Sequence, residues 1–117
     1  MADNSSVSRP EVTSTWARVA HGDAWQELGR HRVRSGGGTL ELPGVRLMAS
    51  GLPHPQWNNC DVDNVDLVDI AAVRDWYAAR AVPWGMRVPA GSAWPYGRRL
   101  FRKRLMALTP SAFRPVP

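Results

Sequence analysis

The chain has 117 residues, about the length of one domain, and 44% of them are hydrophobic, so a modest core is expected and wholesale disorder is excluded. No apolar run approaches the ~20 residues of a membrane span, and the first residues lack the hydrophobic stretch of a signal peptide. The single cysteine, Cys60, excludes an internal disulfide and is typical of a reducing compartment. We therefore expect a cytoplasmic protein without a membrane anchor.

The net charge of +5 is concentrated at the carboxyl end. Residues 98–117 contain six basic residues and no acidic one, whereas residues 1–97 contain nine arginines and ten acidic residues. Five of those acidic residues are aspartates within residues 61–75. An acidic middle and a basic end can attract each other within one fold, or the basic end can form a partner surface.

Residues 1–12 are polar and contain Pro10, which predicts a disordered tail. From Thr13 the pattern becomes helical, because apolar residues recur at helical spacing. These residues are Trp16, Val19, Ala20, Ala24 and Leu28. Thr13 or Ser14 can cap the start of this helix, and Gly22 is expected to divide it into two short helices.

Residues 39–50 predict a β-hairpin, because apolar residues alternate on either side of Pro43-Gly44, a favourable central pair for a type II turn. Residues 57–62 predict another strand. Asp66 and Asp69 favour the start of a helix, which should stop before Pro83. Alternation then predicts a strand over residues 84–88.

Residues 96–108 predict a last helix with an apolar face and a basic face. Phe101, Leu105 and Leu108 form the first, and the second contains Arg98, Arg99, Arg102 and Lys103. The proline-rich residues 109–117 resemble a linker. We thus expect one domain over 13–108 of the α+β class, with a mostly antiparallel sheet of three to four strands packed against two to three helices.

Several short segments resemble the amino-terminal region of actinobacterial two-part proteins of the GNAT acetyltransferase superfamily. They are Gly36–Val45, Ser50–Pro53, Trp57–Asn59, Pro83–Gly91, Gly97–Phe101 and Leu105–Leu108. The resemblance implies a partial GNAT-like fold and a degenerate, non-catalytic half. The catalytic half, which binds acetyl-CoA, follows it in such proteins.

A GNAT site holds the pyrophosphate of acetyl-CoA in a glycine-containing loop between a strand and a helix N-terminus. The matching position here is Asp61–Asp66, which has no glycine and three carboxylates that would repel a pyrophosphate. The sequence therefore predicts no cofactor, no catalytic residue and no metal for this chain. Acetyl-CoA would belong to the catalytic half.

Other groups of residues are weaker candidates for a site. The Arg30–Arg34 run before Gly36–Gly38 could contact phosphate, but no phosphate-loop pattern is complete. A metal at His54, Cys60, Asp61 and Asp63 lacks paired ligands, and no spacing brings His54 or His21 to Cys60 as a base. The six tryptophans could form a ligand platform, although several are expected in the core. One or two left exposed near Pro53 or Pro95 would mark a contact surface.

The leading hypothesis is that this chain docks onto a catalytic GNAT half, or onto copies of itself, through an open sheet edge. The candidate docking surface comprises Trp84, Trp94, Arg98, Arg99 and Arg102. One alternative is a small basic protein that binds nucleic acid through the helix at residues 97–108. Another is a stand-alone acetyltransferase assembled by oligomerisation.

Overall fold

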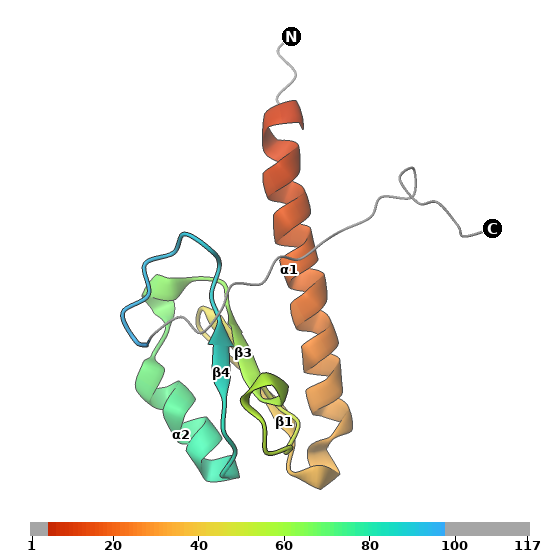
Figure 1. Ribbon diagram of the computed structural model, residues 1–117, viewed down its shortest axis with the longest axis vertical. Coiled ribbons are helices and arrows are strands. Elements are labelled where there is room, and N and C mark those ends of the chain that lie inside the picture. Colours follow the sequence, from red (N-terminus) through yellow and green to blue (C-terminus); the bar gives the residue numbers. More distant parts are fainter. Residues whose placement is uncertain (1–4, 98–117) are drawn as a thin grey trace, which may run out of the picture.

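The computed structural model describes residues 5–97, and the side chains from residue 15 onward. Its helices and strands are α1 (Ser5–His31), β1 (Gly38–Leu42), β2 (Val45–Ala49), β3 (Asn59–Val62), α2 (Ile70–Arg80) and β4 (Gly85–Arg87). The sheet order is β1-β2-β3-β4, with α2 on one face and α1 on the other (Figure 1). The predicted α+β class is confirmed, and the arrangement is compatible with a partial GNAT-like fold.

The β1–β2 hairpin forms as predicted around Pro43-Gly44. Gly44 has a φ of 75°, which the second central position of a type II turn requires. The turn sets the register, which pairs Leu42 with Val45 and runs without interruption to Gly38 and Ala49. β2 pairs antiparallel with β3 along its other side.

The sheet becomes mixed at β4, which pairs parallel to β3. α2 makes the crossover that a parallel pair needs. Asp69 caps α2 by accepting a hydrogen bond from the Ala72 N–H, so the helix starts later than the sequence predicts. Asp66 lies instead in a short 3-10 turn, Val65–Leu67.

The hydrophobic core lies between the sheet and α2. Its buried residues are Val45, Leu47, Ala49, Cys60, Val62, Val68, Val73 and Tyr77. Tyr77 also donates its hydroxyl to the Met48 carbonyl, 2.8 Å away. That bond gives the buried hydroxyl a partner and links α2 to β2.

On the other face, α1 is one continuous helix of 27 residues. It begins at Ser5, so it includes residues that the sequence assigned to a tail, consistent with cooperative extension from an established helix. The prediction that Gly22 divides it is wrong. Gly22 is buried against the sheet, and the helical hydrogen bonds continue through it.

α1 contacts the sheet through residues with little or no side chain. Gly22, Gln26 and Gly29 are buried and lie on one face of the helix, since they are four and three residues apart. A Cβ at Gly22 would collide with the Arg46 guanidinium, and one at Gly29 would lie 2.6 Å from the Gly38 carbonyl. Between them, Gln26 donates its side-chain N–H to the Leu47 carbonyl, 3.0 Å away.

The apolar residues that predicted α1 therefore do not form its buried face. Trp16 is 62% exposed and Val19 is 50% exposed, and Ala20 and Ala24 are exposed too. The sheet accepts the glycine face because only there can the two backbones approach closely. Of the predicted last helix, Tyr96 and Gly97 are not helical, and the rest lies outside the described residues.

Replacing Gly29 with alanine tests this packing. Helix propensity alone would stabilise α1 by about 1 kcal/mol. We expect Gly29→Ala to lower the free energy of unfolding by about 1–3 kcal/mol instead, because the new methyl group overlaps the Gly38 carbonyl. Chemical denaturation measures the change.

The matched control is Ala24→Gly at an exposed position of the same helix, expected to cost about 1 kcal/mol by propensity alone. If Gly29→Ala stabilises the protein, the contact between α1 and the sheet is contradicted.

Candidate functional site

A row of charged side chains crosses all four strands on the face that α1 covers. Glu41 pairs with Arg46, Arg46 with Asp61, and Asp61 with Arg87 in the strand register. The charges therefore alternate in sign from one edge of the sheet to the other. Opposite charges on neighbouring strands stabilise a sheet, whereas like charges would destabilise it.

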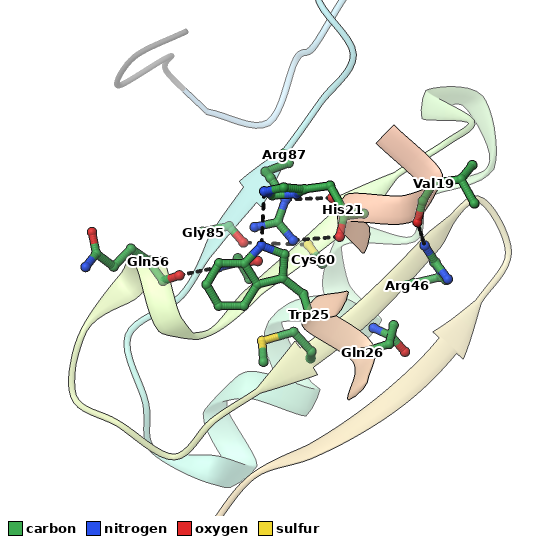
Figure 2. A network of polar contacts seen from close by, with 12 residues as sticks. Val19, His21, Trp25, Gln26, Arg46, Gln56, Cys60, Gly85 and Arg87 are labelled. Carbon is green, nitrogen blue, oxygen red and sulfur yellow. Dashed lines mark hydrogen bonds and ion pairs between the residues drawn. The ribbon is translucent and has the colours of Figure 1, made fainter. Parts of the chain in front are cut away.

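Two ion pairs hold this charged row in place. Arg87 binds Asp61 with two parallel hydrogen bonds, both 2.6 Å long, and both side chains are largely buried. Arg46 binds Asp23 on α1 at 2.6 Å. It also donates to the Val19 carbonyl, as Figure 2 shows. The first pair ties β4 to β3, and the second ties α1 to β2.

Aromatic rings cover one end of the charged row. The Arg87 guanidinium lies 5.1 Å from the centre of the Trp25 ring, a cation–π contact that Figure 2 shows from close by. Trp25 meets Trp57 edge to face at 5.5 Å, and its indole N–H donates to the His21 ring. Trp57 is 36% exposed, so one side of this cluster is open to solvent.

A buried asparagine fixes the loop that presents Trp57. The side-chain oxygen of Asn58 accepts hydrogen bonds from the backbone N–H groups of Ser50 and Gly51. Its amide donates to the carbonyls of Leu52 and His54. With its hydrogen bonds made inside the loop, Asn58 gives the exposed segment 53–57 a defined shape.

The β3–α2 connection is the position where the family resemblance would place a pyrophosphate loop. There the Asp69 carboxylate occupies the helix N-terminus, at 3.2 Å from the Ala72 nitrogen. The Asn64 side chain accepts the N–H of Asp66. Asp63, Asp66 and Asp69 are all exposed around this helix end, so negative charge gathers where an anion would need to bind.

Cys60 is not placed to act as a nucleophile. It lies on the core side of β3, fully buried, with its thiol near the Gly85 carbonyl. Burial raises the pKa of the Cys60 thiol to about 12, and the neighbouring Asp61 adds to the effect. Burial likewise raises the pKa of the Tyr77 hydroxyl. Both groups stay protonated near neutral pH, and His54 is exposed on its loop.

The structure places the two tryptophans of the predicted docking surface on the core. Trp84 stacks on Tyr77 with ring centres 4.9 Å apart and planes 4° apart, and Trp94 packs against the same cluster and against Tyr96. Both remain partly exposed. Arg98, Arg99 and Arg102 lie outside the described residues.

The other tryptophans divide between core and surface. Trp76 also packs against the core, whereas Trp16 and Trp57 are exposed. Trp57 therefore matches the expectation of an exposed tryptophan near Pro53. Arg30 forms an ion pair with Glu27 at the end of α1, and Arg32 donates to the Ser50 carbonyl, so these two arginines of the Arg30–Arg34 run have partners within the chain.

The charged row was missed in the sequence, although a signal for it exists. Each member stands in an expected strand between two apolar residues, as Glu41 stands between Leu40 and Leu42. Strand alternation therefore places all of them opposite the core side of their strands. Which strands are neighbours, and hence that the charges alternate, depends on a sheet order that the sequence leaves open.

Among residues 5–97, no group of three or more histidine, cysteine, aspartate or glutamate side chains could hold a metal ion. No helix in this part of the chain is both long and apolar enough to cross a membrane. Comparison of the chain with models of protein families, with curated proteins and with solved structures finds no match.

The Cys60 thiol gives a pH-dependent prediction. Its folded pKa, about 12, lies above the ordinary value near 9, so the unfolded chain loses this proton first as the pH rises. The protonated thiol therefore stabilises the folded chain fully below pH 9, and this contribution is lost between pH 9 and about pH 12.

We expect the difference in unfolding free energy between the natural chain and Cys60→Ala to shrink by about 1.4 kcal/mol per pH unit in that interval. Urea denaturation at a series of pH values measures it. Because Tyr77 is present in both proteins, its own titration largely cancels. A difference that stays constant across the interval contradicts the burial of a protonated thiol.

Proposed function

We propose that this chain is a non-catalytic, acetyltransferase-like half that acts in the cytoplasm by docking onto a catalytic GNAT half. The proposal rests on the family resemblance of its sequence segments together with the geometry of the β3–α2 connection. Acetyl-CoA would be bound by the catalytic half.

The observation that carries the proposal is the carboxylate at the N-terminus of α2. In a β-α-β unit, backbone N–H groups and the helix dipole at this point favour a phosphate. Here Asp69 accepts the Ala72 N–H, and two further exposed aspartates stand beside it. A pyrophosphate would have to displace one carboxylate and approach the others, which argues against cofactor binding by this chain.

The surface beside β4 supports docking. β4 is an edge strand, and the partly exposed Trp84 and Trp94 precede and follow it in the chain. Gly85 donates its N–H to the backbone carbonyl of Asn58, towards β3. The backbone groups of the next residue, Met86, therefore point away from β3, to the open edge of the sheet. One residue cannot hold a partner strand by itself. Docking here would therefore depend on the tryptophan side chains and on Arg98, Arg99 and Arg102 of the basic segment.

Isothermal titration with acetyl-CoA tests the cofactor part of the proposal. We expect no saturable binding of acetyl-CoA to the chain alone. Among the described residues, α2 is the only α-helix that follows a strand, and aspartates surround its N-terminus. Micromolar binding would contradict it and would favour a stand-alone acetyltransferase.

The docking part is tested with the protein encoded by the neighbouring reading frame. We expect that frame to encode a catalytic GNAT half that co-elutes with this chain in size-exclusion chromatography. Reversing the charges of Arg98, Arg99 and Arg102 to glutamate should abolish co-elution. The control reverses Arg34 and Arg74, which are exposed on other parts of the chain, and should leave it intact.

A neighbouring frame without such a protein, or one whose product elutes separately, contradicts docking.

The same variants distinguish docking from the alternative that the chain binds nucleic acid. If the basic segment binds a duplex, affinity should fall steeply with salt, and the charge reversal should reduce the slope. Duplex binding without co-elution would replace the proposal with that alternative.

A further inference from the structure

We propose that the free edge of β1 pairs antiparallel with β1 of a second copy, which joins two four-stranded sheets into one. This goes beyond the proposed function, because it needs only this chain and uses the sheet edge opposite β4. The observations that support it are the hydrogen-bonding register of β1, its lack of proline, lysine and bulges, and the complementarity of the strand to itself.

The turn determines which backbone groups of β1 are free. Leu42 and Val45 flank a two-residue turn and so form a hydrogen-bonded pair. Because bonded and non-bonded positions alternate, Leu40 and Gly38 also bond towards β2. The N–H and C=O groups of Thr39 and Glu41 therefore point outward, and no described residue accepts or donates to them.

β1 lacks three of the features that usually prevent edge pairing. Proline, lysine and bulges protect edge strands in natural proteins. Gly38–Leu42 contains no proline or lysine, and it pairs with β2 one residue to one residue along its whole length. The strand is thus regular enough to accept another strand.

The strand is also complementary to itself. An antiparallel pairing centred on Leu40 places Thr39 opposite the partner's Glu41, and Glu41 opposite the partner's Thr39. All the outward backbone groups are then bonded, and each threonine hydroxyl lies near a carboxylate. On the core side Leu40 meets the partner's Leu40, and no like charges face each other.

On the α1 side of the sheet, the side chains of Thr39 and Glu41 are only partly covered. A shallow depression lies between α1 and β1, lined by Asp23, Gln26, Arg30, Thr39, Leu40, Glu41 and Arg46. Glu41 is exposed there and, among the described residues, forms no ion pair.

Sedimentation equilibrium of the isolated chain tests the proposal. We expect the mass to rise with concentration from 13.0 kDa to twice that value. Glu41→Pro should keep the chain monomeric, because it removes an outward N–H at an edge position that tolerates proline. Glu41→Gln, which keeps that N–H, should still associate.

Hydrogen exchange of the natural chain provides a second readout that does not depend on the folding of a variant. The amides of Thr39 and Glu41 should become more protected as concentration rises, whereas Leu40, already bonded to β2, should not change. A chain that stays monomeric at about 1 mM, where an interaction of about 4 kcal/mol would still be visible, overturns the proposal. So does association in which Thr39 and Glu41 remain unprotected. Neither result bears on the docking of a catalytic half beside β4.

Discussion

The close approach of α1 to the sheet is the contact on which the rest of the structure depends. Glycine at positions 22 and 29 lets the helix backbone lie almost against the strands, and Gln26 bonds to a strand carbonyl between them. A glycine in a helix interior costs about 1 kcal/mol relative to alanine, so each must be offset by packing. The helix thereby covers the sheet face that carries the charged row, with the buried Met48 side chain next to Gly29.

The charged row is a consequence of that geometry. Arg46 and Asp61 both lie next to Gly22, so the helix crosses the charged row where it has no side chain to exclude them. Asp23 and Trp25, which both follow Gly22 in the sequence, then contact Arg46 and Arg87. One face of the sheet is thus held by hydrophobic packing, and the other by hydrogen bonds, ion pairs and aromatic contacts together with the buried Met48.

Local signals predicted the hairpin, the two later strands and α2, because alternation, the Pro43-Gly44 turn and Pro83 act over a few residues. They failed for the buried face of α1, since hydrophobic periodicity marks large apolar side chains and this contact is made by glycines. Asp69 rather than Asp66 caps α2 because the β3–α2 connection first makes a 3-10 turn. The charged row and the core position of Trp84 depend on which strands and helices are neighbours, which no local pattern contains.

The functional proposals use surfaces that this packing leaves open: the side beside β4, the edge of β1 and the carboxylates at the start of α2. All of them depend on α1 and α2 covering opposite faces of one sheet.

A nuclear Overhauser spectrum tests the contact between α1 and the sheet most directly. A Cβ at Gly29 would lie 2.8 Å from the Thr39 methyl carbon, so a strong cross peak between the Gly29 α-protons and the Thr39 methyl group is predicted. A Thr39 methyl group with cross peaks to strand residues and none to α1 would contradict it.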